Sequence, residues 1–499
     1  MKSDVDVLIV GAGPSGLVLA CDLQRRGVTF RLIDASMRGF EGSRAKGVQP
    51  RTLEVLDDLG VLSRLQSRSM LYPPLGLHLG PLTFRRTMIK LHAATPDVPH
   101  SNTLLAPQYA TDLSLRERLE ELGAGVNYST RLLSFTQHEG GIVAQLETAE
   151  DTEEVRARYI IGADGGSSAV RRALGIPFRG TTDESDRMIV ADVDLTGISS
   201  DRWHIWPRKQ GRFVALCPLP GGKFQLMLKL RPQDSAEMDA ASIENLVRDA
   251  IGSRKVRIHR IHWSSVWRPN IRLAERYRVG RALLVGDAAH VHPPTGAQGL
   301  NTGVQDAYNL GWKIGQVLAG GDDELLDTYE AERQPVATRV LGLASGLYAH
   351  IVDAPLTAMK RGDEERQLAL TYRGGPLASN VATDEKVDAG DRAPDSPVTL
   401  VGGEGTTLFD LFRGPSFTVL AIGARALDAL APVRWSGKGA VIKTVVLDDT
   451  RNNAFRDIYG TPSDALLLIR PDGYVAARAT GELHGVLDWP SLPFFPPSL

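Results

Sequence analysis

A glycine-rich segment near the start of the chain has the spacing that binds the phosphates of a dinucleotide. Gly11, Gly13 and Gly16 follow an apolar run and open a helical pattern, with Ser15 in its first turn. These glycines would allow a tight turn, a close approach of backbone to a pyrophosphate, and close packing of helix on strand. Asp34, 18 residues after Gly16, ends the next apolar run and could accept hydrogen bonds from a ribose. The segment predicts a dinucleotide site; a glycine turn without a ligand is the plainer alternative.

Two further acidic positions follow predicted strands in the same manner. Asp164 comes after a short strand at 159–161, and Asp287 follows Gly286 at the end of a strand at 281–286. Because ligands of doubly wound sheets bind at the carboxyl ends of the strands, both carboxylates are expected near the same nucleotide. Asp164 could instead cap a turn, since Asp-Gly is a common turn dipeptide.

The hydrophobic pattern predicts an α/β framework that positions these residues. A strand at 5–10, a helix to about Arg26 and a strand at 29–33 form a βαβ opening. Segment 72–99 is irregular and contains several prolines. Helical spacing recurs at 51–65, 113–122 and 303–319.

The middle and the end of the chain have a different pattern, with short strand-like runs between Gly and Pro turns. Those of the middle predict an antiparallel sheet, and those of the end a separate C-terminal α/β domain. The runs lie at 188–195, 212–218 and 223–230 in the middle, and at 417–422, 442–447 and 465–469 near the end.

Composition excludes several classes of protein. A chain of 499 residues is too long for one hydrophobic core, so two to four domains are expected. The net charge of -2 gives no excess of positive charge that would bind nucleic acid or a membrane surface. The sequence contains no run of 18 consecutive apolar residues, so a transmembrane helix is not expected. The two cysteines, Cys21 and Cys217, lie far apart and favour a reducing cytoplasm over a disulfide framework.

Three motifs in this order resemble those of the class A flavoprotein aromatic hydroxylases, the para-hydroxybenzoate hydroxylase type. They are the glycine-rich segment, the passage 162–171, and the passage 278–301. The resemblance extends to about residue 345 and implies FAD as the dinucleotide. It also implies a Rossmann-like FAD-binding domain interleaved with an antiparallel β-sheet substrate domain.

The resemblance further implies roles for individual residues. Asp287 would hold the ribityl chain, and Gln108 would meet the same region. Arg44 and Pro294 would position the reaction, Arg44 near the movable flavin ring and Pro294 against its reactive face; no acid or base can be named. The backbone at the start of the helix after the third motif would face the N1–C2=O edge of the flavin, at Gly299, Leu300 and Asn301.

The C-terminal part resembles the thioredoxin-like extension of polyketide and phenol hydroxylases, most clearly in 465–475. This part contains no cysteine, so a thiol redox role is excluded, and packing, dimerisation or stability is expected instead. Its removal should alter assembly or stability without abolishing FAD binding. The predicted domains are 1–180 and 271–378 for the cofactor, with 72–101 contributing to the substrate side, 181–270 for the substrate, and 385–499 for the thioredoxin-like extension.

By this resemblance the chain hydroxylates a phenolic or polycyclic aromatic compound, such as an aromatic polyketide or antibiotic in tailoring or resistance. NAD(P)H would dock transiently as co-substrate, since only one GxGxxG is present, and O2 would react through a flavin C4a-hydroperoxide. No metal is expected, because His290 and His292 lack carboxylate or cysteine neighbours. The pocket wall would come from the middle strands, where alternating apolar residues could equally be core; the candidates are Trp206, Phe213, Phe224 and Met227.

Other functions remain open on the same scaffold. One is Baeyer–Villiger oxygenation of a ketone, and another is a flavin-bound protein that binds a ligand without turnover. A flavin-dependent halogenase is disfavoured, because Trp203-His-Ile-Trp206-Pro has the wrong spacing for the motif of that class. A monomer or a homodimer is compatible with the sequence.

Overall fold

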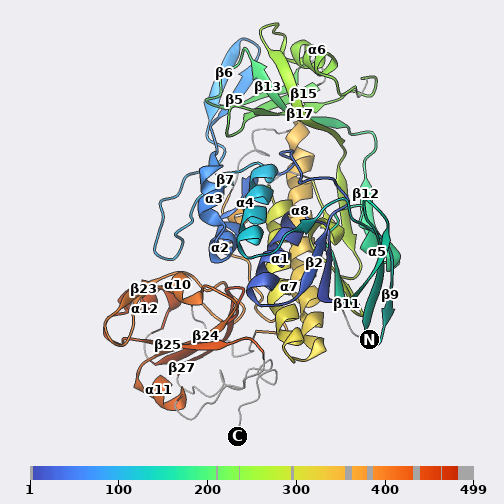
Figure 1. Cartoon of the computed structure of the whole chain (residues 1–499). Coiled ribbons are helices and arrows are strands. Elements are labelled where there is room, and N and C mark those ends of the chain that lie inside the picture. The colour runs from blue at the N-terminus through green and yellow to red at the C-terminus, as the bar shows by residue number, and fades with distance from the viewer. Residues whose placement is uncertain are drawn as a thin grey trace.

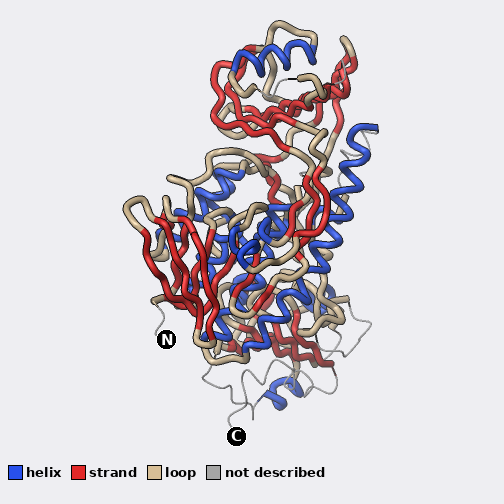
Figure 2. The backbone as a smooth tube through the Cα atoms, turned by 90° about the vertical axis from the view of Figure 1, so that its right-hand side faces the viewer, coloured by secondary structure: helices blue, strands red, loops and turns tan. Residues whose placement is uncertain are grey.

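The structure, a computed structural model, arranges the chain in three bodies. It describes residues 4–209, 212–234, 237–293, 297–353, 362–378, 386–430, 439–461 and 464–480. Figure 1 shows a central α/β body, a β-sheet body above it and a C-terminal body below it, and Figure 2 shows the same order from the side. The predicted α/β fold class is confirmed.

A parallel sheet forms the centre of the first body. Its order is β19-β20-β11-β1-β2-β8, and β9 and β10 extend it as an antiparallel branch from β11. The continuous apolar run of β1 predicts a strand covered on both faces, and its last four residues are buried. The bounds are β1 Val5–Val10, β2 Phe30–Ile33, β8 Val126–Asn127, β9 Arg131–His138, β10 Gly141–Glu147, β11 Thr152–Gly162, β19 Arg278–Val279 and β20 Ala282–Leu284.

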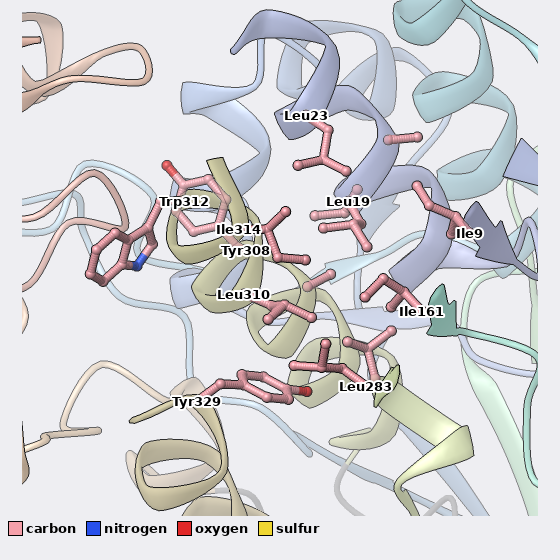
Figure 3. Close-up of a cluster of buried hydrophobic side chains, with 14 of the residues drawn as sticks. Ile9, Leu19, Leu23, Ile161, Leu283, Tyr308, Leu310, Trp312, Ile314 and Tyr329 are labelled. Carbon is pink, nitrogen blue, oxygen red and sulfur yellow. The ribbon is translucent and has the colours of Figure 1, made fainter. Parts of the chain in front are cut away.

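Helices cover this sheet, and α1 and α7 pack closely against each other. Figure 3 shows Leu19 and Leu23 of α1 facing Leu310 and Ile314 of α7. The single helix expected at 51–65 is divided into α2 and α3, because the backbone turns at Gly60 with φ +73°. The bounds are α1 Pro14–Arg25, α2 Pro50–Asp58, α3 Leu62–Ser67, α4 Gln108–Glu121, α5 Ala169–Ala173, α7 Gly299–Leu318 and α8 Asp327–Asp353, with 3-10 turns η1 Gly286–Ala288, η2 Asp323–Leu326 and η3 Glu364–Arg366.

The second body is a seven-stranded sheet in the order β17-β13-β16-β15-β14-β5-β6. The segment expected to be irregular supplies β5 and β6, because β5 pairs in parallel with β14, more than a hundred residues away. Helix α6 covers one face; we call the opposite face the inner face. The bounds are β5 Leu75–Leu79, β6 Leu82–Arg86, β13 Met188–Thr196, β14 Trp203–Lys209, β15 Arg212–Pro218, β16 Phe224–Lys229, α6 Ala240–Ile251 and β17 Arg257–Trp267.

Two small sheets lie beside the central body. One has the order β3-β7-β4 and the other β12-β18-β21. The bounds are β3 Gly47–Val48, β4 Met70–Leu71, β7 Leu104–Leu105, β12 Phe178–Thr182, β18 Asn270–Ala274 and β21 His290–Val291.

The C-terminal body has a four-stranded sheet in the order β25-β24-β26-β27, with β24 parallel to β25 and antiparallel to β26. A parallel pair next to an antiparallel hairpin agrees with the thioredoxin-like expectation. The bounds are β22 Pro397–Thr399, β23 Gly405–Thr407, α10 Leu408–Phe412, β24 Phe417–Ile422, α11 Ala424–Leu430, β25 Ile442–Leu447, α12 Asn453–Tyr459, β26 Ala465–Ile469 and β27 Val475–Thr480.

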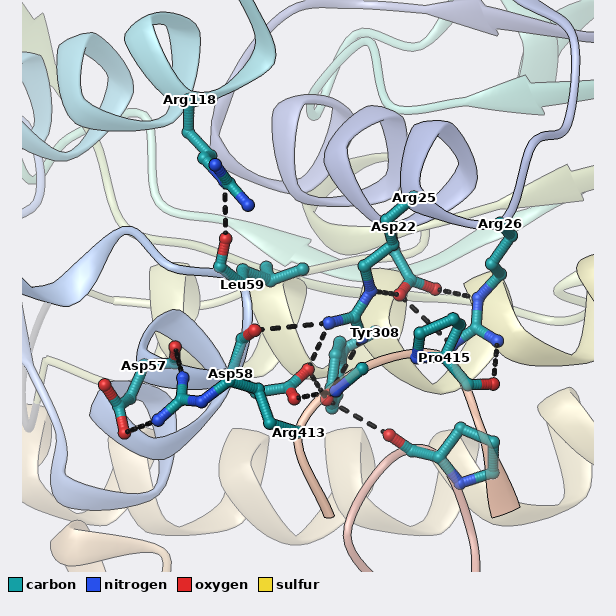
Figure 4. A network of polar contacts seen from close by, with 12 residues as sticks. Asp22, Arg25, Arg26, Asp57, Asp58, Leu59, Arg118, Tyr308, Arg413 and Pro415 are labelled. Carbon is teal, nitrogen blue, oxygen red and sulfur yellow. Dashed lines mark hydrogen bonds and ion pairs between the residues drawn. The ribbon is translucent and has the colours of Figure 1, made fainter. Parts of the chain in front are cut away.

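Charged side chains join the C-terminal body to the central one. In Figure 4, Arg26 of α1 donates to the carbonyl of Pro415 at 2.9 Å, and Arg413 donates to the Asp57 carboxylate of α2 at 3.2 Å. The two bodies therefore share a polar junction as well as apolar packing.

Candidate functional site

The turn between β1 and α1 is shaped by its glycines. Gly11 has φ +105°, and a Cβ there would overlap the backbone of Ala163, while a Cβ on Gly16 would overlap the carbonyl of Gly11. A Cβ on Gly13 would meet nothing within 4 Å. Gly11 and Gly16 thus serve close packing, whereas Gly13 borders open space at the start of α1.

Three loops converge at this point. Ala163, in the loop after β11, donates its N–H to Val10 O at 2.8 Å, and Val285, after β20, donates to Gly162 O at 2.9 Å. Ser15 lies beside Gly286, where an added Cβ would come within 2.5 Å of the Ser15 hydroxyl oxygen. The carboxyl ends of β1, β11 and β20 therefore meet at the N-terminus of α1, as the three motifs predict.

Asp34 ends β2 beside the same turn. Its carboxylate accepts from the N–H of Ala12 at 2.8 Å and from the N–H of Ser36 at 2.9 Å. The Ser36 hydroxyl also donates to this carboxylate; since the side chain is partly exposed, one oxygen lone pair remains for a further donor. This position suits recognition of ribose hydroxyls.

Asp164 lies in the second loop, and its carboxylate meets the N-terminus of α5, whose N-cap residue is Ser168. Its Oδ2 accepts from the N–H of Ala169 at 2.6 Å, as the turn-capping alternative predicts. Its Oδ1 is buried and has no hydrogen-bond partner among the described residues. Cap and ligand contact are therefore compatible, one on each oxygen.

Asp287 lies on η1, and its side chain is exposed at the carboxyl end of β20. Beneath it, His290 hydrogen-bonds Asp306 of α7 at 2.6 Å, and Arg333 of α8 donates to Asp306 at 2.7 Å. Burial would raise the pKa of Asp306, but Arg333 and His290 lower it below its ordinary value. The loop that carries Asp287 is thus supported from below by a buried cluster of polar and charged side chains around Asp306, which sequence reasoning did not identify.

The N-terminus of α7 faces the same region. No side chain caps it, and the first N–H groups of a helix lack partners within the helix. The Asn301 side chain donates to Gly47 O at 2.8 Å and accepts from Gln49 N at 2.8 Å, so it joins this helix to 47–49. Gly299 and Leu300 are partly exposed beside it. Pro294 lies outside the described residues.

Arg44 and Gln108 lie on either side of the loop before β3. Arg44 is exposed and stacks over the rings of Phe40 and Trp263, 5.4 and 5.9 Å from their centroids. Gln108 begins α4; its N–H donates to Ala45 O at 2.8 Å, while its side-chain amide lies 3.4 Å from Asp112. Gln108 is therefore joined to the residue that follows Arg44.

The four predicted pocket residues lie on opposite faces of the seven-stranded sheet. Trp206 and Phe224 belong to the core under α6, whereas Phe213 and Met227 lie on the inner face. Side chains alternate along a strand, and the sequence did not indicate which face α6 would cover.

Partly exposed aromatic side chains cluster on the inner face. They are Tyr72, Trp203, Trp263 and Trp267, beside Met227. Sequence reasoning missed the three tryptophans because β14 and β17 were not predicted as strands, and it missed Tyr72 because segment 72–99 was expected to be irregular. The spacing of Trp263 and Trp267, four residues apart and so on one side of a strand, is the signal that could have found them.

The residues present fit FAD. Open space at Gly13 adjoins a helix N-terminus that no side chain caps. Buried oxygens around it have no partner among the described residues, and they belong to Thr111, Asp112 and Asp164. Such buried oxygens are costly unless a ligand or water donates to them.

The burial of the Asp112 carboxyl can be tested in the apoprotein. Burial raises its pKa from 3.8 to about 8, and Arg116 only partly opposes this. The folded protein therefore binds this proton more tightly than the unfolded chain does. The resulting contribution to the free energy of unfolding is lost as pH rises from about 4 through about 8. The melting temperature of the apoprotein should therefore fall by roughly a few degrees more in wild type than in Asp112→Asn between about pH 6 and about pH 8.5. Equal slopes for the two proteins would contradict the buried, protonated carboxyl.

The described residues contain neither a metal-binding cluster nor a membrane-spanning helix. No group of three or more His, Cys, Asp or Glu side chains there could hold a metal ion. No described helix is long and apolar enough to cross a membrane.

Comparison with known proteins places these features in context. A family described as FAD binding domain matches residues 4–344, and one described as aromatic-ring hydroxylase, C-terminal, matches 387–488. A flavin-dependent monooxygenase of Mycobacteroides abscessus is 38% identical over 94% of this chain and 96% of its own.

Two further relatives cover almost the whole chain. A 12-dehydrotetracycline 5-monooxygenase/anhydrotetracycline 6-monooxygenase of Streptomyces rimosus is 32% identical over 99% of both chains. The crystal structure of aklavinone-11 hydroxylase in a ternary complex with FAD and aklavinone has a TM-score of 0.81 at 27% identity and covers 99% of both chains.

Proposed function

The chain belongs to the FAD-binding family of aromatic-ring hydroxylases, and on this premise we propose that it hydroxylates a phenolic or polycyclic aromatic compound with O2 and NAD(P)H. One observation carries the proposal. The loops after β1, β11 and β20 meet at the N-terminus of α1, and the N-terminus of α7 faces the same region. This arrangement suits a long dinucleotide that ends in a flavin ring.

Residues in these loops would each bind a different part of FAD, from the adenosine to the flavin ring. Asp34 would bind the adenosine ribose, the N-terminus of α1 at Gly13 and Ser15 the pyrophosphate, and Asp287 the ribityl chain. FAD, when bound, supplies the redox chemistry that transfers electrons to dioxygen. The N–H groups of Gly299, Leu300 and Asn301 would donate to the carbonyl edge of the ring, where a helix N-terminus favours negative charge. The remaining predicted contacts are Gly11, Gly16, Arg44, Gln108, Asp164, Gly286 and Pro294.

The inner face would form the substrate wall. Its partly exposed aromatic rings suit a flat aromatic molecule, and they keep water away from the reaction. Phe213 and Met227 remain pocket candidates, and Tyr72, Trp203 and Trp263 join them. The tetracycline and aklavinone relatives support an aromatic polyketide or antibiotic as substrate.

Several finer features belong to the same proposal. NAD(P)H would dock transiently, and we keep the division into cofactor, substrate and thioredoxin-like domains at the boundaries predicted from the sequence. Both cysteines are free and buried, which supports a reducing, cytoplasmic location.

The test is to screen phenols, naphthols and hydroxyanthraquinones for stimulation of NAD(P)H oxidation by the FAD-loaded protein. We expect severalfold stimulation by a subset, with a product that carries one added oxygen as a new phenolic hydroxyl. A ring-expanded ester from a ketone would indicate Baeyer–Villiger oxygenation instead. Tight binding with no stimulation by any compound would indicate a binding protein and contradict the proposal.

A further inference from the structure

Residues 40–46, which we call the strap, lie across the inner face of the seven-stranded sheet. They cross one row of paired residues, in which Trp263 of β17 pairs with Asp192 of β13, and Asp192 with Gln225 of β16. The strap is part of the cofactor body in sequence, yet the side-chain partners of Ser43 at its centre belong to the substrate sheet. It is therefore a direct connection between the two.

Asp192 is the centre of this connection. Its side chain is fully buried; one carboxylate oxygen accepts the N–H of Ser43 at 2.7 Å, and the other accepts the Ser43 hydroxyl. The Gln225 amide donates to Ser43 O at 2.6 Å and to the Ser43 hydroxyl oxygen at 2.7 Å, and it accepts from the Lys46 ammonium. Hydrogen bonds to a charged acceptor are roughly twice as strong as neutral ones. Ser43 is thus held through its N–H group, its hydroxyl and its carbonyl oxygen.

The rest of the strap packs on the neighbouring tryptophan. The Phe40 ring meets Trp263 edge-on at 5.5 Å, and Arg44 stacks over both rings. A Cβ on Gly42 would come within 2.5 Å of Trp263 Cδ2, so only glycine fits there. The contact of Gly42 with Trp263 therefore fixes where the strap crosses the row of Trp263, Asp192 and Gln225.

The last two residues of the strap, and Gly47 directly after it, are held by the cofactor body. Ala45 O and Lys46 O accept the N–H groups of Gln108 and Ala106 at 2.8 and 2.9 Å, and Gly47 O accepts the Asn301 amide at 2.8 Å. A few residues thus link the substrate sheet to the N-terminus of α7. A shift at Ser43 would be passed to Arg44 and Gly47.

We propose that Asp192 is a positioning residue that pins the strap to the inner face, and so fixes Arg44 and the α7 N-terminus relative to bound substrate. The inference rests on the proposed function for its catalytic consequence, although the pin itself does not depend on it. Burial raises the pKa of the Asp192 carboxyl above its ordinary value, and the bonds from Ser43 oppose this only in part.

The experiment compares FAD-loaded wild type with Asp192→Asn. Asparagine keeps the shape but loses the charge and one acceptor, so the strap should loosen. Asp194→Asn is the control, because Asp194 lies on the same strand, is partly exposed and bonds only His262 among the described residues. Ser43→Ala is the second variant, since it removes both bonds of the hydroxyl, to Asp192 and from Gln225, and keeps the N–H bond to Asp192.

The first readout is the rate at which trypsin cuts after Arg44, with hydrogen exchange of peptides that cover the strap. Asp192→Asn should be cut about tenfold faster than wild type and Ser43→Ala to a smaller extent, since local opening is limited by the bonds that hold the segment. The FAD content of Asp192→Asn should equal that of wild type. The control Asp194→Asn should be cut at the wild-type rate. An unchanged cutting rate in Asp192→Asn overturns the pin.

The second readout is coupling of NAD(P)H oxidation to hydroxylation with a stimulating phenol. A misplaced strap should reduce substrate stimulation about tenfold and release more H2O2 for each NAD(P)H consumed, because small displacements near reacting groups have large effects. A loosened strap with normal stimulation and coupling overturns the positioning role. If wild type itself hydroxylates nothing, the proposed function fails, and the tryptic result still decides the pin.

Discussion

Replacing Gly13 by alanine is expected to leave the apoprotein folded and to weaken FAD binding about a hundredfold, the factor that corresponds to about 2.7 kcal/mol. The backbone at Gly13 has φ -76° and ψ -176°, which alanine adopts without strain, and a Cβ there meets no protein atom within 4 Å. Under the proposed function that space holds the pyrophosphate, so the methyl group would displace it from the N-terminus of α1. Fluorescence titration of the apoprotein with FAD measures the effect.

Gly16→Ala is the matched control three residues further on. Its Cβ would overlap the carbonyl oxygen of Gly11, so this variant should lower the melting temperature of the apoprotein itself. A Gly13→Ala protein that binds FAD as tightly as wild type would contradict the placement of the phosphates. A Gly13→Ala apoprotein that fails to fold would contradict the open space.

Replacing Arg470 by methionine is expected to lower the free energy of unfolding by about 3–5 kcal/mol. Arg470 donates to Glu332 at 2.5 Å and 3.0 Å and to Asp472 at 2.6 Å, and Lys313 donates to Glu332 at 2.8 Å. All four side chains are at most 2% exposed. Two cations thus balance two carboxylates, and methionine would leave one buried negative charge without compensation. Urea unfolding followed by circular dichroism measures the loss.

The surface pair Arg425–Asp464 provides the control. Arg425 is 62% exposed, so Arg425→Met should cost less than about 1 kcal/mol. A loss of similar size in Arg470→Met would contradict the account of a desolvated cluster.

Deleting residues from 385 onward should be milder for the cofactor site than its size suggests. The remaining chain keeps Lys313 with Glu332, and Arg51 with Glu54 at 2.8 Å, so each pair stays balanced when Arg470 and Arg392 are removed. The junction would become exposed to water, which favours separated charges. We expect a less stable protein that still binds FAD; a folded truncation without flavin would show that the extension shapes the cofactor site.

Much of the candidate cofactor site could be predicted from short stretches of sequence. The run 5–10, the three glycines and Asp34 predict a strand, a turn and an acid within one βαβ unit, and local backbone preferences are enough to form it. The motifs at Asp164 and Asp287 each follow a strand of the same sheet. Their convergence with the first motif was predicted because parallel strands end at one edge.

The substrate side was not predictable in the same way. Segment 72–99 contains two strands only because it pairs with β14, and no local pattern encodes that pairing. Phe213 and Phe224 both lie in predicted strand runs, yet Phe224 lies under α6 and Phe213 on the inner face. An acid within the apolar run 188–195 was a signal of a buried polar site at Asp192, but its partner Ser43 is 149 residues away.

The amino-acid sequence by itself determined the nucleotide-binding turns and the parallel strands that carry them, because these depend on glycine conformations and apolar runs within a few residues. Only the tertiary structure decided which aromatic side chains line the inner face, how Asp192 holds the strap, and how Asp306 and Glu332 are neutralised. Those features depend on which face a helix covers and on which distant charges are desolvated together, and a linear pattern contains neither.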